Sequence, residues 1–248
     1  MKKSLNIAIV GLGNIGLYLY KYLLKNKDYL SKKTNVVPNI LYVSAKNIKK
    51  KRKVKIPKSK WLKNYLKTTK LKNIDLIVEL IGGAEGPAKK LVFQALKNKK
   101  HVITANKALI AKYGDKLSKI AEKNKVNLEF EAAVCGGVPV VRSLKEGLIA
   151  NSIEKIYGIL NGTSNFILTS MEKNNIDFQD ALNKAKKLGY AESNPISDLN
   201  GNDVADKLKI LTSLSFNSYL NNKSIHIEGI NSIDAIDIKN AKILGYKI

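Results

Sequence analysis

Short apolar runs alternate with stretches of helical spacing through the first half of the chain. Runs of about four to eight apolar residues predict buried strands, whereas apolar residues three or four positions apart predict amphipathic helices. The predicted strands are 7–10, 40–43, 74–80, 101–104 and 127–134, and the helices between them include 60–66, a segment opening at Pro87, and 117–123. Strands and helices that alternate in this way predict a doubly wound α/β domain of Rossmann-like architecture.

The pattern changes after residue 134. The segment 135–139, Cys-Gly-Gly-Val-Pro, interrupts the alternation, and helices then outnumber strands. We therefore predict two domains, with residues 1–134 forming the nucleotide-binding domain and residues 135–248 a second domain. The predicted elements of the second domain are helices at 140–149, 166–171, 178–188 and 200–216 and a strand at 153–160. This mixture predicts an α+β domain.

The first predicted strand runs directly into a glycine-rich turn and a helix. Gly11, Gly13 and Gly16 follow the strand, with Asn14 and Ile15 between the last two glycines. Gly11 allows a tight turn, Gly13 allows close approach of backbone to a pyrophosphate, and Gly16 allows close packing of helix on strand. The helix N-terminus adds N–H donors and partial positive charge. This context favours dinucleotide binding over an ordinary glycine turn of another α/β protein.

The helix predicted at 200–216 carries an acid and a base on its apolar side. Asp203 and Lys207 lie one turn apart within the arc formed by Val204, Leu208 and Leu211. As a surface ion pair they would contribute only ~0.3–0.5 kcal/mol. A pair that faces the core carries a desolvation cost of several kcal/mol, which a ligand or polar cleft can offset. The helical wheel of residues 200–216 therefore leaves two interpretations open, an ordinary ion pair and a functional site.

Composition narrows the class of protein. A chain of 248 residues can hold one large domain or two modest ones, and no apolar run approaches the ~20 residues of a membrane span. Cys135 is the single cysteine, and the two histidines make a histidine-built metal site improbable. Met1-Lys2-Lys3 and the apolar residues after it lack a cleavage signal. We expect a cytoplasmic enzyme without a membrane partner.

The formal charge of +24 raises the question of nucleic-acid binding. Arg52 and Arg142 are the only arginines among the 44 basic residues, and the lysines are scattered along the chain. Arginine is the preferred residue for bidentate phosphate and base recognition, and aromatic residues do not alternate with the lysines. The basic segment 46–60 is more simply a solvated loop after the second strand. We therefore expect no nucleic-acid partner.

Five motifs, in order along nearly the whole chain, resemble homoserine dehydrogenases. They are Gly11-x-Gly13-x-x-Gly16, Thr104-Ala105-Asn106-Lys107, the segment 131–139, the segment 158–163, and Gly189-Tyr190-Ala191-Glu192 continuing through Asp198, Gly201, Asp203 and Lys207. The resemblance implies NAD(P)-dependent interconversion of L-aspartate 4-semialdehyde and L-homoserine in threonine, methionine and isoleucine biosynthesis. It also implies a homodimer.

The same resemblance assigns roles to the polar residues of these motifs. Lys107 matches the catalytic lysine, which serves as electrophile and acid at the carbonyl, and Asp203 matches the carboxylate that hydrogen-bonds the reacting hydroxyl. Glu192 matches the partner of the substrate ammonium group. Lys207 is expected to pair with Asp203 or with the substrate carboxylate. Tyr190 and Asp198 match further substrate-binding positions.

A monovalent cation such as sodium is also implied by the resemblance. Its expected ligands are the Glu131 carboxylate and the backbone carbonyls of Val134, Gly136 and Val138, a donor set suited to a hard cation. Without the resemblance, Glu131 would be an unremarkable acid on a strand. Cys135 beside this loop is expected to be a small packing residue.

Cofactor choice depends on the end of the second strand. NAD usually requires an acid there, whereas the sequence has Ser44-Ala45-Lys46-Asn47. We predict NADP(H) as the preferred cofactor, with NAD possible, and place Ser44 and Lys46 near the 2′-phosphate. Gly82 and Thr104 complete the predicted cofactor-binding residues.

Two features of the resemblance bear on activity. Asn194 stands where the family commonly has an aspartate before the proline, and the sequence ends at Ile248, where family members continue with more of the substrate domain. We therefore expect a shortened chain with an incomplete second domain. The alternative to an active enzyme is a non-catalytic dinucleotide-binding fragment. Oxidation of a semialdehyde through a thioester on Cys135 is a third hypothesis, disfavoured by the lack of a well-placed histidine.

Overall fold

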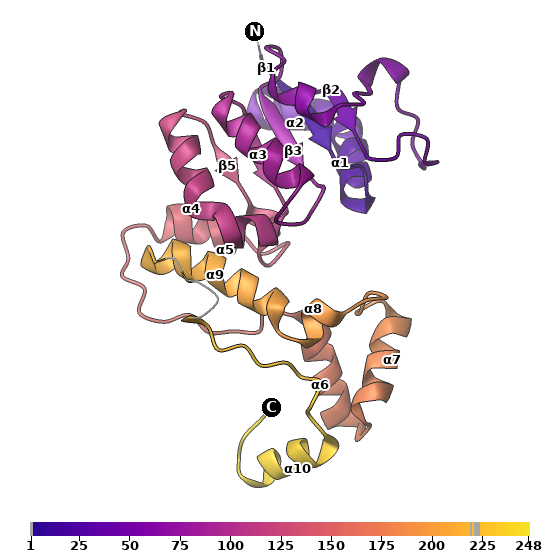
Figure 1. Ribbon diagram of the computed structural model, residues 1–248, viewed down its shortest axis with the longest axis vertical. Helices are drawn as coiled ribbons and strands as arrows, with labels where there is room; N and C mark the ends of the chain where they lie inside the picture. The colour runs from indigo at the N-terminus through magenta and orange to yellow at the C-terminus, as the bar shows by residue number, and fades with distance from the viewer. Residues whose placement is uncertain (1, 219, 221–223) are drawn as a thin grey trace. The chain divides into compact units, whose positions relative to one another are not determined.

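The computed structural model describes residues 2–218, 220 and 224–248. Its contacts divide the chain into two compact units, Met1–Gly147 and Leu148–Ile248 (Figure 1). Among the described residues, no helix is long and apolar enough to span a membrane.

A parallel five-stranded sheet forms the centre of the first unit. Its strands are β1 (Lys3–Val10), β2 (Val36–Ser44), β3 (Leu76–Glu79), β4 (His101–Thr104) and β5 (Leu128–Glu129). They lie in the order β2-β1-β3-β4-β5, and every neighbouring pair is parallel. The predicted doubly wound α/β domain is confirmed.

The register aligns the carboxyl ends of four strands. Val10 lies opposite Ser44 on one side and Glu79 on the other, and Glu79 in turn lies opposite Thr104. The chain turns outward in opposite directions from β1 and β3, so the switch point of the sheet lies between these strands. Ligands of open α/β sheets bind at such a point.

Four α-helices connect these strands. They are α1 (Asn14–Lys25), α2 (Lys27–Thr34), α3 (Pro87–Lys97) and α4 (Lys107–Lys123). Pro87 opens α3 as predicted, and Leu91, Val92, Ala95 and Leu96 of this helix are fully buried. Because parallel crossovers are right-handed, the opposite directions of the connections place α1 on one face of the sheet and α3 and α4 on the other.

Two predicted elements of this unit are wrong in detail. The helix expected at 60–66 is replaced by two short 3-10 helices, η1 (Lys58–Lys60) and η2 (Tyr65–Thr69). Trp61 between them forms a bridge to Val43, and Lys60 Nζ donates to the carbonyl of Ile40 at 2.6 Å, so tertiary contacts hold this segment against β2. The strand expected at 127–134 ends at Glu129, and η3 (Glu131–Ala133) follows.

The segment after η3 belongs to the first unit by its contacts. It contains α5 (Val140–Arg142) and a π-helical turn, η4 (Ser143–Gly147), so the helix predicted at 140–149 ends two residues early. The units divide after Gly147, whereas the sequence predicted a boundary after Val134. Hydrogen bonds from α5 to Glu131 and an ion pair between Lys145 and Glu129 hold this segment to the sheet.

Helices make up the regular structure of the second unit. They are α6 (Gly162–Asn174), α7 (Phe178–Leu188), α8 (Ile196–Leu199), α9 (Asn202–Phe216) and α10 (Ala235–Ile243). Ile167, Met171, Leu182 and Leu199 belong to their shared core. Gly189 ends α7 in the left-handed conformation at φ 81°, as predicted for a C-cap.

The strand predicted at 153–160 does not form. No described residue of this unit is in a strand, and Tyr157 and Ile159 are 86% and 75% exposed. An extended segment becomes a strand only when its backbone N–H and C=O groups pair with a neighbour. Among the described residues none provides that pairing, so the apolar pattern of 153–160 alone did not produce a strand.

Candidate active site

The turn after β1 has the steric features expected of a pyrophosphate loop. Gly11 has φ 106°, and a Cβ atom there would overlap the carbonyl oxygen of Leu80. A Cβ atom on Gly16 would overlap the carbonyl oxygen of Gly11. Gly13, by contrast, has open space at the Cβ position. Gly11 and Gly16 are therefore required by the fold, whereas the space beside Gly13 remains accessible to a ligand.

The N-terminus of α1 is suited to an anion. Gly13 is the N-cap residue and supplies no side-chain cap, the first turn contains no acidic residue, and the first backbone bond runs from Leu17 N to Gly13 O. The initial N–H groups of a helix have no acceptor within the helix. With Ile15 64% exposed, this end of the helix can receive the phosphate groups of a dinucleotide.

Glu79, which the sequence analysis did not identify, is fully buried at the carboxyl end of β3. One of its carboxylate oxygens accepts the N–H groups of Ile81 and Gly82, at 2.7 and 3.1 Å. The other accepts the Thr104 hydroxyl of β4. Glu79 therefore fixes the loop after β3 relative to the end of β4. A lone acid within the apolar residues 76–80 was the available signal.

The N-terminus of α4 is connected to the same loop. The Thr104 hydroxyl accepts the N–H of Asn106, and Asn106 caps the helix through the N–H of Leu109 at 3.1 Å. The Asn106 amide also donates to the carbonyl of Gly83 at 2.8 Å. Lys107 is the first residue of α4, so its backbone position is fixed at the carboxyl edge of the sheet.

A charged cluster ties the other end of this loop to α4. The Glu85 carboxylate accepts Lys89 and Lys112 at 2.9 and 2.8 Å and also the Tyr113 hydroxyl. Hydrogen bonds from Lys112, Tyr113 and Lys89 lower the pKa of Glu85 to about 2. The loop contains Gly82, Gly83 and Gly86 at positive φ, conformations that glycine adopts readily.

The end of β2 differs from the expected arrangement. Ser44 is 2% exposed, and its hydroxyl donates to the carbonyl of Leu62 at 2.8 Å. Lys46 is exposed. The Arg52 guanidinium donates to the carbonyls of Asn47, Ile48 and Lys50 and lies 5.1 Å from the centre of the Trp61 ring. Arg52 therefore organises this basic loop internally.

The second unit contains the acid and base that the helical wheel identified. Lys207 Nζ lies 2.7 Å from Asp203 Oδ2, and the two side chains are 17% and 5% exposed. The Lys207 ammonium also donates to the carbonyl of Leu160 at 2.6 Å. Burial of this pair, predicted from the wheel, is confirmed.

Asn161 brings Asp198 into the same cluster. Its amide nitrogen donates to Asp198 Oδ1 at 2.7 Å and to Asp203 Oδ2 at 2.9 Å. From the sequence, Asn161 was known only as part of the motif 158–163, without a role of its own. Tyr190 stacks on Phe166 at 4.4 Å and is 57% exposed, and Glu192 is exposed. The hydrogen bonds of this cluster therefore join the predicted catalytic residue Asp203 to two predicted substrate-binding residues, Asp198 and Lys207. The other two predicted substrate-binding residues of this unit, Tyr190 and Glu192, lie outside these hydrogen bonds.

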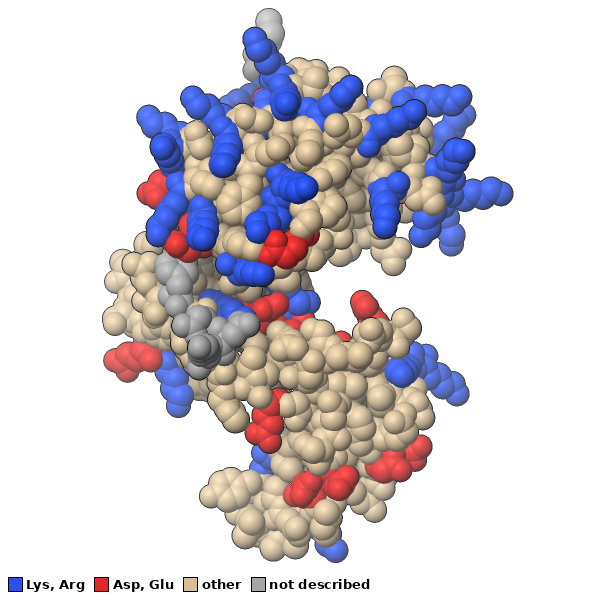
Figure 2. Space-filling view, in the orientation of Figure 1, with Lys and Arg blue, Asp and Glu red and all other residues tan. Residues whose placement is uncertain are grey.

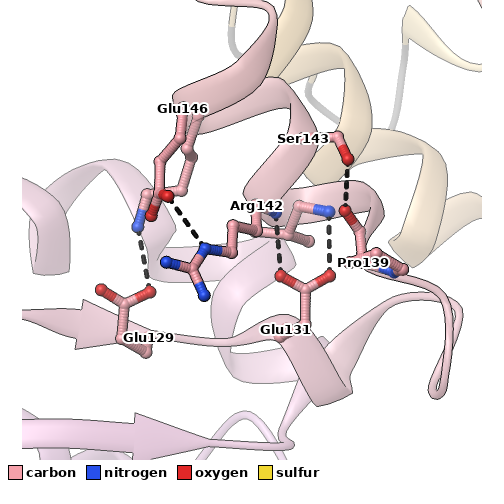
Figure 3. Close-up of polar contacts among 8 residues, drawn as sticks. Glu129, Glu131, Pro139, Arg142, Ser143 and Glu146 are labelled. Atoms are coloured by element: carbon pink, nitrogen blue, oxygen red, sulfur yellow. Dashed lines mark hydrogen bonds and ion pairs between the residues drawn. The ribbon is translucent and has the colours of Figure 1, made fainter. Parts of the chain in front are cut away.

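The predicted cation loop is built around Glu131 (Figure 3). Its two carboxylate oxygens accept the N–H groups of Val141 and Arg142 at 3.0 and 2.8 Å, which caps α5. Arg142 in turn forms an ion pair with Glu146. Within the described residues no three His, Cys, Asp or Glu side chains cluster as a metal site. A cation here would therefore depend on backbone carbonyls together with Glu131.

The donor chemistry of the loop suits a hard cation. Carboxylate and carbonyl oxygens each have two acceptor positions, so Glu131 can accept an N–H and still face an ion. Cys135 at φ 49° and Gly137 at φ 91° turn the backbone sharply within the loop. Cys135 is half-buried, and its role as a packing residue stays a prediction.

The first unit defines the class of the protein. A parallel sheet, a glycine turn at its switch point and an uncapped helix N-terminus together characterise dinucleotide-binding proteins of the Rossmann type. Sequence profiles agree with this class: residues 11–131 match the NAD-binding domain of homoserine dehydrogenase, and residues 139–248 match the homoserine dehydrogenase domain. The chain belongs to the homoserine dehydrogenase family.

Individual relatives support this assignment. The chain is 41% identical over 246 residues to a homoserine dehydrogenase of Neisseria gonorrhoeae, with 99% of the chain and 56% of that protein covered. A homoserine dehydrogenase structure from Thiobacillus denitrificans matches with TM-score 0.91 and 39% identity, covering 99% of this chain and 57% of the other. A hyperthermophilic archaeal homoserine dehydrogenase in complex with NADPH matches with TM-score 0.75 and 25% identity, over 94% and 76%.

The chain thus spans little more than half the length of its curated relatives. The gap between the two profile matches, residues 132–138, contains the predicted boundary after Val134, whereas the compact units divide after Gly147. The predicted boundary itself stays a prediction.

Proposed function

We propose that the chain is an oxidoreductase that interconverts L-aspartate 4-semialdehyde and L-homoserine with NAD(P)H. The observation that carries this proposal is the buried Asp203–Lys207 pair in a chain whose other unit has an open dinucleotide turn. Burial of such an ion pair costs desolvation free energy. Apolar residues of similar size could fill the same space without that cost, so a structural role alone does not explain the pair. Its position in the family's own motif supports a catalytic role.

The proposed roles of the residues follow the chemistry of carbonyl reduction. Bound nicotinamide supplies the hydride. Lys107 donates a proton to the carbonyl oxygen, and Asp203 accepts the hydrogen bond of the resulting hydroxyl. Glu192 binds the substrate ammonium group. Lys207 forms an ion pair with the Asp203 carboxylate and so fixes its position. Asp198 and Tyr190 complete the substrate-binding residues.

We propose NADP(H) as the preferred cofactor. The support is the absence of an acid in the segment 44–47 and the exposed ammonium group of Lys46. The phosphates would be bound by the turn of Gly11, Gly13, Asn14, Ile15 and Gly16, and Gly82 and Thr104 would be the further cofactor-binding residues. The buried Ser44 hydroxyl is assigned a supporting role for the 44–62 loop, because it donates to Leu62.

We further propose a sodium-like cation at the loop of Glu131, Val134, Gly136 and Val138, a homodimer, and a cytoplasmic location. The cation proposal is supported by the oxygen donors of the loop and by the carboxylate that lies beside it. A two-domain division after Val134 is also retained as a proposal.

The test is NADPH oxidation with L-aspartate 4-semialdehyde by the purified chain. Lys107→Ala is expected to lower kcat by about a hundredfold or more, because general acid catalysis contributes about that much. Lys116→Ala, at an exposed position of the same helix, is the matched control and should retain the activity of the unchanged chain.

The alternative function is dinucleotide binding without turnover. The chain spans 56% of its relative's length, and this is the observation that favours the alternative. NADPH binding by fluorescence, with no turnover in the unchanged chain, would support it and contradict the enzymatic proposal.

A further inference from the structure

The loop after β3 lies directly against the glycine turn after β1. The Leu80 N–H donates to the Val10 carbonyl at 2.8 Å. A Cβ atom on Gly11 would lie 2.2 Å from the Leu80 oxygen and 2.9 Å from the Ile81 nitrogen. The two backbones are therefore in direct contact, and a shift of Leu80 or Ile81 would displace the turn that is suited to the pyrophosphate.

Glu79 holds the start of this loop from inside the unit. The residue is 0% exposed, and one side-chain oxygen accepts the N–H groups of Ile81 and Gly82 at 2.7 and 3.1 Å. The other oxygen accepts the hydroxyl of Thr104, which is also 0% exposed. A buried donor that loses its acceptor carries a desolvation cost, because water does not readily replace the missing partner. The conformation of the loop therefore depends on where the Glu79 side chain is held.

Thr104 continues the connection to the start of α4. Its hydroxyl donates to Glu79 and accepts the Asn106 N–H at 3.0 Å. The Asn106 side-chain amide returns to the loop by donating to the Gly83 carbonyl at 2.8 Å. These hydrogen bonds close a ring that runs from Glu79 through the loop, Asn106 and Thr104 back to Glu79. Lys107 follows Asn106 in the chain, so the ring includes the backbone next to the proposed catalytic lysine.

We propose that Glu79 is a positioning residue that couples cofactor binding to the placement of Lys107. The ring joins the loop that lies against the glycine turn to the backbone that carries Lys107, so these parts move as one body. Glu79 acts through the loop and Thr104 and not on the substrate. This inference rests on the proposed function, in which NADPH binds at the turn and Lys107 is the acid.

Substitutions at Thr104 test this connection with little change of shape. Thr104→Val removes the hydroxyl, whereas Thr104→Ser keeps it. The matched control is Thr69→Val. Thr69 is 0% exposed, and its hydroxyl donates to the Leu66 carbonyl at 2.8 Å and accepts the Asn98 amide at 3.3 Å. The control therefore removes a buried hydroxyl with one hydrogen bond in each direction, outside the ring.

The first measurement is amide hydrogen exchange by NMR. In Thr104→Val, the N–H groups of Ile81 and Gly82 should exchange about tenfold faster than in the unchanged chain, because their acceptor Glu79 is no longer held in place. Thr104→Ser should keep the slow exchange, and Thr69→Val should leave these two N–H groups unchanged. Equal exchange of Ile81 and Gly82 in Thr104→Val and the unchanged chain would overturn the proposal.

Glu79→Leu tests the connection in the other direction. Leucine fills the buried position but has no acceptor oxygen. We expect the Asn106 N–H, whose acceptor is the Thr104 hydroxyl, to exchange about tenfold faster in this variant. Unchanged exchange at Asn106 would show that the ring does not extend to α4 and would overturn the coupling. If circular dichroism shows that Glu79→Leu does not fold, Thr104→Val decides the question alone.

The second measurement is the Kd for NADPH by fluorescence, together with kcat for reduction of L-aspartate 4-semialdehyde. In Thr104→Val, the Kd should rise and kcat at saturating NADPH should fall, each by about tenfold. A merely structural defect reduces the amount of folded chain, which lowers the apparent kcat but leaves the Kd unchanged. That result would overturn the positioning role.

A double variant distinguishes coupling through the ring from direct cofactor contact by Thr104. Adding Thr104→Val to Glu79→Leu should raise the Kd for NADPH by less than about twofold, because the ring is already broken. The full effect of Thr104→Val in both backgrounds would show that the two residues act independently and would overturn the proposal. Absence of turnover in the unchanged chain would contradict the proposed function, and the exchange measurements would still decide whether Glu79 holds the loop and α4 together.

Discussion

Glu85 is an exposed carboxylate held by three donors, and its contacts extend from the loop after β3 to α4. Lys112 and Tyr113 come from α4, and Lys89 comes from α3. The buried Glu79 carboxylate accepts the N–H of Ile81 in the loop after β3 and the hydroxyl of Thr104 at the end of β4. Both acids stabilise the surroundings of Lys107 rather than supply reactive groups themselves, and neither was identified from the sequence.

The pH dependence of stability follows from Glu85. Its pKa in the folded chain is about 2, below the ordinary value of 4.5, so its stabilising contribution is complete above 4.5 and is lost as the pH falls towards 2. The difference in free energy of unfolding between the unchanged chain and Glu85→Gln should therefore shrink on acidification. Urea titrations of both proteins at several pH values measure this difference in the free energy of unfolding.

Glu122→Gln is the control for loss of a charge at an exposed position of α4. A difference between the unchanged chain and Glu85→Gln that stayed constant down to about pH 3 would contradict the assignment of the lowered pKa to these contacts.

At the scale of elements, the β1–α1 turn combines two kinds of glycine. Gly16 packs helix against turn so closely that no side chain fits, whereas Gly13 faces open space. A motif search assigns all three glycines the same importance. The structure separates those required for folding from the one available for ligand approach.

Substitution of these glycines should separate folding from binding. Gly16→Ala is expected to lower the free energy of unfolding by about 1–3 kcal/mol or more, because its methyl group would overlap the Gly11 carbonyl. Gly13→Ala should change stability by less than about 0.5 kcal/mol but weaken NADPH binding about tenfold or more. Denaturant titration and NADPH fluorescence measure the two effects. Equal loss of stability in both variants would contradict this division of roles.

At the scale of the whole molecule, the chain consists of two units with different surfaces and cores. Lysine and arginine side chains are spread over the visible face of the first unit in Figure 2 and do not form a single stripe. The expectation that the charge of +24 does not mark a nucleic-acid site stays a prediction. The connection between units follows the π-helical turn Ser143–Gly147.

The two candidate boundaries predict different stabilities for isolated first units. A fragment ending at Gly147 should be more stable than one ending at Val134, because the shorter fragment loses the Val141 and Arg142 N–H donors of Glu131. Two hydrogen bonds to a charged acceptor correspond to about 3 kcal/mol. Thermal unfolding by circular dichroism compares the fragments. Equal stability would favour the boundary after Val134.

The sequence by itself determined the alternation of strands and helices, the glycine turn, the buried acid–base pair and the family. These features are local or periodic: a helix places residues three and four apart on one face, and a tight turn requires glycine at particular positions. The family motifs add positions that no periodicity explains. For that reason Lys107, Asp203 and Lys207 could be selected before the structure was known.

Only the tertiary structure decided the partners of the polar groups. Glu79 meets Thr104, Asn161 meets Asp198 and Asp203, and Ser44 turns towards Leu62, across separations of 18 to 42 residues. The segment 153–160 has a strand-like pattern but lacks a paired neighbour among the described residues. Hydrogen bonds and strand pairing depend on groups brought together by folding, so a local pattern cannot specify them.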